Sequence, residues 1–192
     1  LTISNEARVF NAIGFIGDVS SSLNNVVTVT GASSLWSNGS SLFVGLFGAG
    51  NALTISNGAS VFNDIGFIGD QASSSNNVVT VTGASSLWSN RSELYVGNSG
   101  AGNALTISNG ARVENSFGRI GAQASSSNNV VLVTGANSLW SNLGELRVGF
   151  FGAGNALTIS NGASVVNNIG VIGNGSSSSN NVVTVTGAGS LW

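Results

Sequence analysis

The sequence lacks several residue types, and each absence removes a class of chemistry. Cysteine and histidine are absent, which excludes disulfides, thiol or imidazole catalysis and the common zinc and copper ligand sets. We therefore expect neither a cofactor nor a metal centre. Charged residues make up only 6% of the chain, all five cations are arginine, and the formal net charge is −2. Because nucleic-acid binding needs a basic stripe, no nucleic-acid partner is expected. No apolar run reaches the roughly 18 residues that cross a bilayer, so this segment is not expected to insert into a membrane.

What the chain does contain is a repeat. Four tryptophans close nearly identical stretches, at intervals of 88 − 36 = 140 − 88 = 192 − 140 = 52 residues. The copies open on Leu-Thr-Ile-Ser-Asn and divide the chain into repeats 1–52, 53–104, 105–156 and 157–192, the last of them incomplete. A fixed period of this length predicts stacked units, so residues 1–192 are interpreted as one solenoid segment, of the kind cut from a longer array.

Each 52-residue repeat contains two related halves, for example 53–77 and 78–104. Each half has three short apolar runs rich in Val, Ile and Thr, separated by Gly, Asn and Ser. Three short strands with their turns in about 26 residues is the size of one coil of a parallel β-helix. The sequence therefore predicts an all-β solenoid with three strands per coil and two coils per repeat.

Side-chain alternation assigns the faces of the predicted strands. In the first strand of each coil, aliphatics such as Leu53 and Ile55 alternate with hydroxyls such as Thr54, so the aliphatics are expected inside. Invariant aliphatics of the other two strands are also expected inside. They are Val9, Val61, Val113 and Val165, Leu35, Leu87, Leu139 and Leu191, and then Ile16, Ile68, Ile120, Ile172, Val44, Val96 and Val148.

The outward hydroxyls form the first candidate binding face. It includes Thr28, Thr30, Thr54, Thr80, Thr82, Thr184 and Thr186. Rows of Thr-x-Thr resemble the ice-binding faces of some β-solenoid antifreeze proteins. The alternative is purely structural, because Thr is favoured on exposed strand faces and pairs well across strands. Leu132 interrupts one row.

The aromatic residues form the second candidate face. Parity predicts that the tryptophans point outward together with Phe10 and Phe62, and that Phe43 and Tyr95 continue the pattern on the next face. The tryptophans are Trp36, Trp88, Trp140 and Trp192. Exposed rings can stack on sugars or on a neighbouring rod. In the alternative interpretation the chain bends after each Trp and folds the indole over a corner as a structural peg.

Two further groups have mainly structural interpretations. The paired turn asparagines, such as Asn76-Asn77, are expected to bond from coil to coil and to adopt left-handed geometry. Seven of the twelve charged residues fall in three adjacent coils: Arg91, Glu93, Arg112, Glu114, Arg119, Glu145 and Arg147. Ion pairs between coils are the expected role. A polysaccharide-cleaving acid and base pair, Glu114 with Glu145, is a remote alternative, and we expect no enzyme activity.

The segments Ser-Leu-Trp-Ser-Asn, Leu-x-Val-Gly and Gly-Ala-Gly-Asn-Ala-Leu-Thr-Ile-Ser-Asn-Gly-Ala resemble a repeat of bacterial autotransporter passenger regions and other large secreted, adhesin-like proteins. The resemblance covers the whole chain. It implies a right-handed parallel β-helix, displayed on or released from a Gram-negative cell, that acts in adhesion or as a stalk. It implies no catalytic residues.

These observations together predict a structural or adhesive rod segment, located outside the cell or at the bacterial surface. The expected partners are glycans or other copies of the chain, stacked end to end or side by side. An ice-binding solenoid is the alternative function.

Overall fold

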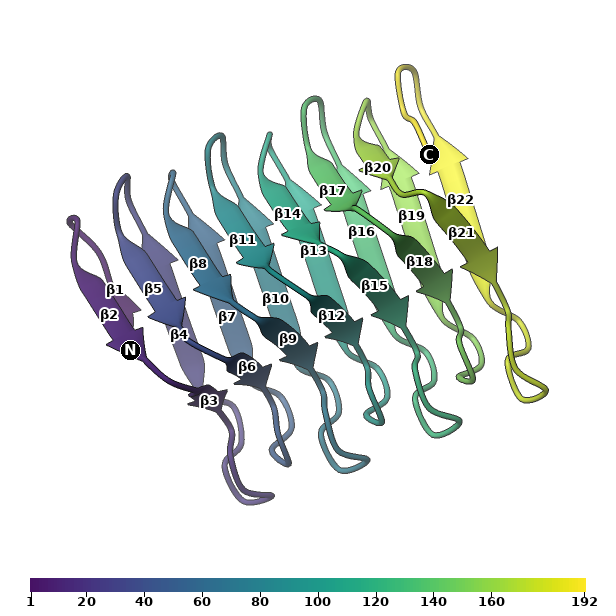
Figure 1. Ribbon diagram of the computed structural model, residues 1–192, viewed down its shortest axis with the longest axis horizontal. Helices are drawn as coiled ribbons and strands as arrows, with labels where there is room; N and C mark the ends of the chain where they lie inside the picture. The colour runs from purple at the N-terminus through teal and green to yellow at the C-terminus, as the bar shows by residue number, and fades with distance from the viewer.

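The computed structural model describes residues 1–192 as a parallel β-solenoid built only of strands and turns (Figure 1). The predicted fold is confirmed: about seven coils of about 26 residues stack along one axis, and each coil contributes one strand to each of three sheets. Strands of one sheet pair in parallel with their counterparts one coil away. There is no helix that is both long and apolar enough to cross a membrane.

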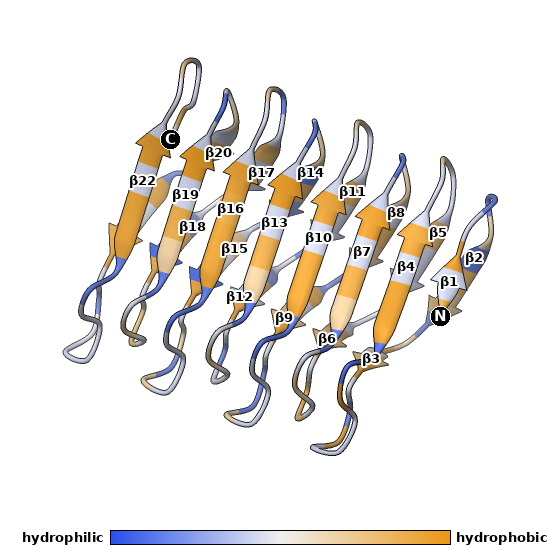
Figure 2. Ribbon diagram, turned by 180° about the vertical axis from the view of Figure 1, so that it is seen from behind, coloured by the Kyte–Doolittle hydropathy of each residue, from blue (hydrophilic) through white to orange (hydrophobic).

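Sheet A holds the first strand of every coil, and Figure 2 shows it facing the viewer, with pale hydroxyl bands crossing apolar strands. Its strands are β1 (Thr2–Ile3), β4 (Val26–Thr30), β7 (Ala52–Ser56), β10 (Val78–Thr82), β13 (Ala104–Ser108), β16 (Val130–Thr134), β19 (Ala156–Ser160) and β22 (Val182–Thr186). The predicted alternation is confirmed, because Leu53 and Ile55 are buried while Thr54 lies outside. A straight, in-register face of outward Thr and Ser results.

Sheet B follows after a short turn. Its strands are β2 (Arg8–Asn11), β5 (Leu35–Asn38), β8 (Ser60–Asn63), β11 (Leu87–Asn90), β14 (Arg112–Asn115), β17 (Leu139–Asn142) and β20 (Ser164–Val166). Sheet C completes each coil with β3 (Gly14–Ile16), β6 (Ser41–Val44), β9 (Ile65–Ile68), β12 (Glu93–Val96), β15 (Phe117–Ile120), β18 (Glu145–Val148) and β21 (Ile169–Ile172). The three sheets enclose one core cluster of 31 buried residues that runs along the rod.

The turns depend on left-handed backbone geometry. Asn24, Asn76, Asn128 and Asn180, the first members of the asparagine pairs, have φ between 56° and 57°. Asn tolerates this region because its short polar side chain bonds locally. The predicted left-handed role is therefore confirmed.

Candidate functional site

The tryptophans do not lie on the outer face, so the outward prediction for them is wrong. Trp88 and Trp140 are 0% exposed and Trp36 is 4% exposed; Trp192, in the last coil, is 39% exposed. Trp88 pairs with Val61 and Val113, and therefore points into the core with them. Four leucines predicted inside lie in the outward row instead: Leu35, Leu87, Leu139 and Leu191. A structural role for the indole fits the burial, although the ring fills the core and not a corner.

Each indole is held by buried asparagines. Trp88 Nε1 donates to Asn63 Oδ1 at 2.8 Å, and Asn63 Nδ2 donates to Asn90 Oδ1 at 2.6 Å. The same pair of bonds joins Trp140 to Asn115 at 2.8 Å and Asn115 to Asn142 at 2.6 Å. Buried donors and acceptors need such partners. The tryptophan–asparagine network therefore fixes the corner between sheets B and C from inside.

A second asparagine system confirms the predicted coil-to-coil bonding. The backbone N–H and Nδ2 of Asn77 both donate to Asn103 Oδ1, at 2.9 and 3.1 Å, and Asn103 bonds Asn129 in the same way. The ladder runs without a break through Asn25, Asn51, Asn77, Asn103, Asn129, Asn155 and Asn181. These side-chain amides hydrogen-bond to one another from coil to coil and are therefore not free to bind a ligand.

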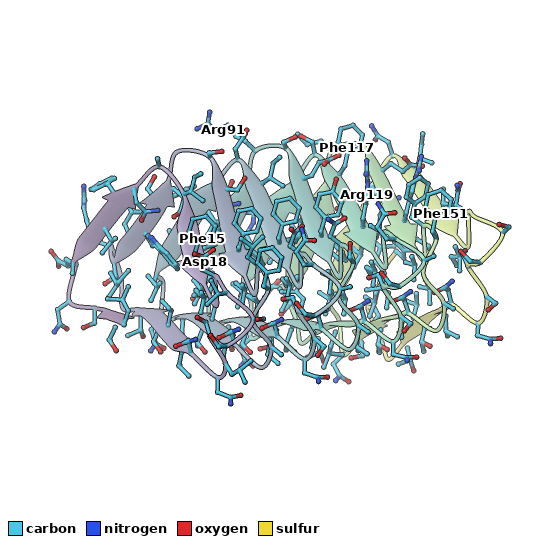
Figure 3. The ribbon with its side chains drawn as sticks, turned by 90° about the horizontal axis from the view of Figure 1, so that it is seen from below. Phe15, Asp18, Arg91, Phe117, Arg119 and Phe151 are labelled. Carbon is cyan, nitrogen blue, oxygen red and sulfur yellow. The ribbon has the colours of Figure 1, made fainter.

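The outer face of sheet C carries a stack of rings. Phe15, Phe43, Phe67 and Tyr95 have centroids 5.3, 4.8 and 5.0 Å apart and are parallel within 5° (Figure 3). The Arg119 guanidinium lies 5.3 Å from the Tyr95 ring centroid and covers the next position. The rings of Phe43 and Phe67 thus cover each other's faces and present edges to solvent, so Phe43 and Tyr95 offer no open ring face to a sugar.

The aromatic residues of sheet B are arranged differently. Phe10 is 66% exposed and Phe62 is 39% exposed. They are separated by Ser37, and Phe62 pairs with Ser37 on one side and Ser89 on the other. Because these neighbours are small, no ring stacks on Phe62 and its faces stay open. Of the predicted aromatic face, Phe10 and Phe62 alone combine outward direction with free faces.

The hydroxyl face of sheet A contains two different columns. In the column with Thr30 and Thr82, hydroxyls bond each other: Ser56 Oγ donates to Thr30 Oγ1 at 2.9 Å, and Ser108 Oγ to Thr82 Oγ1 at 2.9 Å. The neighbouring column, which has no such bonds between side chains, is Thr2, Thr28, Thr54, Thr80, Thr106, Leu132, Thr158 and Thr184. The second column offers an unbonded hydroxyl to solvent in every coil except that of Leu132, whereas most hydroxyls of the first column are bonded.

Comparisons with protein-family models, curated proteins and solved structures give no significant match.

Six of the seven clustered charged residues form three local ion pairs, and Arg91 is the exception. Arg119 bonds Glu93 at 2.9 Å from one coil to the next, whereas Arg112–Glu114 and Arg147–Glu145, both at 2.7 Å, are pairs within one strand. Glu114 stands on sheet B and Glu145 on sheet C. The two carboxylates proposed as an acid and base pair therefore belong to different faces, and each is already paired with an arginine.

Tyr95 belongs to the same charged group on sheet C. Its hydroxyl donates to Glu93, and Arg119 Nη1 donates to Tyr95 Oη at 3.2 Å. Partial burial, reinforced by the bond to Glu93, raises the pKa of Tyr95 from 10.0 to about 12. The phenol therefore stays neutral at ordinary pH and serves as a donor within the face.

Where sheets B and C meet, the surface is hollowed into a groove of about 410 Å³, here called the corner groove. Its lining residues are Ser89, Asn90, Arg91, Arg112, Glu114, Asn115, Ser116, Ser141 and Leu143. Figure 3 shows Arg91 projecting from the edge of the rod, away from the ring stack. The sequence showed the cluster of charges but not the groove, because the groove depends on which residues share a corner. A comparison of the repeats with one another could have pointed to this place, because Arg91 stands where the other repeats have Gly39 and Leu143, and Glu114 stands where the preceding repeat has Phe62.

Proposed function

We propose that this chain is a segment of a structural, adhesive rod that is secreted or displayed at a bacterial surface. The observation that carries the proposal is the unbroken repetition of the coil. Strand pairing keeps its register along sheet A, the buried core is continuous, and the asparagine ladder joins coil to coil. Such a rod gains length without changing its cross-section, and it repeats each outer face along its axis.

The resemblance of the repeat to autotransporter passenger regions supports the same proposal. Adhesion requires outer faces that can vary while the core stays constant. Inward positions such as Val61, Val113 and Val165 are the same in each repeat, whereas the outward residues beside them are Phe62, Glu114 and Val166. This division of roles suits a scaffold that presents different surfaces on one frame.

Adhesion under flow tests the proposal. Beads coated with the purified chain should be retained on mucin, extracellular-matrix protein or bare glass better than beads coated with an unrelated protein of equal net charge. Small-angle scattering should report a rod and not a sphere. The adhesive role would be refuted if both kinds of bead were retained equally on every surface. Sedimentation at several concentrations would show whether copies of the chain associate with each other instead.

An ice-binding solenoid is the second candidate, and the unbonded threonine column favours it. Neighbouring strands repeat at about 4.8 Å, so the hydroxyls and methyls of Thr54, Thr80 and Thr106 form a regular row. Thermal hysteresis of the purified chain tests this function. Replacing Thr80 with Lys should abolish it, whereas the same change at exposed Ser85 should not, and no hysteresis at high concentration would remove the candidate.

A further inference from the structure

The corner groove contains one cation without a partner. Arg91 makes no ion pair and its guanidinium makes no hydrogen bond, whereas Arg112 is bonded to Glu114 at 2.7 Å. The exposed Arg91 side chain therefore keeps its full capacity for a planar anion. A guanidinium binds a carboxylate through two parallel N–H···O bonds, which adds geometric selectivity to the charge attraction.

A short row of unused polar groups lies beside this cation. Ser89, Glu114 and Ser141 are paired in register on β11, β14 and β17, so their side chains repeat at about 4.8 Å along the rod. The Ser89 and Ser141 hydroxyls make no hydrogen bond within the chain. One Glu114 oxygen accepts from Arg112 and the other has no partner. The row therefore offers two hydroxyls and one carboxylate oxygen to a ligand.

The floor of the groove is rigid. Asn115 Oδ1 accepts from Trp140 at 2.8 Å, and Asn115 Nδ2 donates to Asn142 at 2.6 Å. Asn90 Oδ1 accepts from Asn63 at 2.6 Å. Because these amides are fixed by the buried tryptophan–asparagine network, a ligand would meet a surface that needs little ordering on binding.

We propose that the corner groove binds an acidic saccharide, with a sugar carboxylate on Arg91 and sugar hydroxyls on Ser89, Glu114 and Ser141. The unpaired Arg91 guanidinium favours a ligand with one negative charge, and the polar groups of Ser89, Glu114 and Ser141 favour a ligand with several hydroxyls. Leu143 is the only apolar residue of the lining, whereas peptide sites depend on buried apolar anchors. The open ring of Phe62 pairs with Ser89 and can stack on the next sugar.

This inference deepens the adhesive part of the proposed function, since it names a ligand class for one outer face. The site occurs once among the repeats. In the preceding repeat the positions of Arg91, Arg112 and Glu114 hold Gly39, Ser60 and Phe62. The rod therefore carries a single such groove on an otherwise repeated surface, and a binding stoichiometry of one is expected.

Titration calorimetry with a glucuronate-containing oligosaccharide tests the site, using as control the same oligosaccharide with its carboxylates reduced to alcohols. Arg91→Gln should weaken binding of the acidic form roughly ten- to hundred-fold, the usual value of a charge-assisted hydrogen bond. Arg8→Gln is the matched variant, because Arg8 is also exposed and unpaired but stands on β2, far from the groove. Its affinity should equal that of the unmodified chain.

Three results would overturn the proposal: equal binding by the Arg91→Gln and Arg8→Gln variants, equal binding of the reduced oligosaccharide, or tighter binding of an oligoglutamate than of the saccharide. Circular dichroism of Arg91→Gln should match that of the parent, so that a loss of binding reports the groove. The outcome is distinguishable from the broader function. Beads that adhere equally with and without Arg91 refute the groove alone, whereas glycan binding without adhesion refutes the adhesive rod alone.

Discussion

Replacing Gly66 with alanine should destabilise the solenoid, although alanine is normally preferred to glycine inside a strand by roughly 0.5–1 kcal/mol. Gly66 does not use left-handed geometry, so its backbone accepts alanine. The obstacle is packing. An added Cβ would lie 2.3 Å from Asn90 Oδ1, 2.8 Å from Trp88 Cζ2 and 3.0 Å from Leu94 Cδ1.

The magnitude follows from how little the indole can move. Trp88 is fully buried, and its Nε1 is bonded to Asn63 at 2.8 Å. Adding a methyl group to a packed core costs about 1–3 kcal/mol. The reduced entropy of the unfolded chain returns about 0.4–1 kcal/mol. A net loss of about 1–2 kcal/mol is therefore expected.

Guanidinium denaturation followed by tryptophan fluorescence measures the loss, and amide hydrogen exchange should place it in the coils of β8 to β12. Local measurement matters because repeat arrays can open unit by unit. Gly39→Ala is the matched control. Its added Cβ would come no closer than 3.9 Å to any atom, so its stability should be unchanged or slightly raised. If Gly66→Ala proves as stable as Gly39→Ala, the Trp88 indole and the Asn90 amide do not fill the space above Gly66.

Three other changes test the same structure. Trp88→Ala should lower the free energy of unfolding by about 3–5 kcal/mol through the cavity it leaves, measured by the same denaturation. Asn103→Ala should cost about 1–3 kcal/mol for each buried donor left without an acceptor, and should speed amide exchange at Asn77, which bonds Asn103. Ultraviolet titration reports Tyr95 alone, as it is the single tyrosine, and should give a midpoint of about 12. Because the folded-state pKa is raised, Tyr95 contributes to the free energy of unfolding in full below pH 10. This contribution is lost as the pH rises from 10 towards 12. Glu93→Gln should lower this midpoint, and an unchanged midpoint would contradict the bond.

Sheet A could be predicted from the sequence because both halves of the repeat alternate with the same parity. Val79 and Val81 pair with Leu53 and Ile55, and all four are buried. Here the repeat spacing, the apolar pattern and the strand length agree. The asparagine ladder was also predictable, since turn asparagines recur at every coil.

Sheet B could not be aligned correctly because its preceding turn differs in length. β8 begins four residues after Ser56 (60 − 56), whereas β11 begins five residues after Thr82 (87 − 82). A one-residue difference exchanges the two faces of a strand. Aligning Leu87 with Val61 therefore turned Trp88 outward. Alignment from Asn63 and Asn90, which pair at the far end of the strands, would have placed Trp88 with Val61 in the core.

The core also explains why the repeat contains two coils and not one. Coils with Trp88 and Leu94 alternate with coils that have Val61 and Gly66 at the same inward positions. The Trp88 indole lies over Gly66, so the large inward side chains of one coil fill the space that the small inward side chains of the next coil leave. Outward residues take no part in this exchange of volume. A binding groove can therefore be built on sheet B by outward substitutions alone, and Glu114 in place of Phe62 is such a substitution.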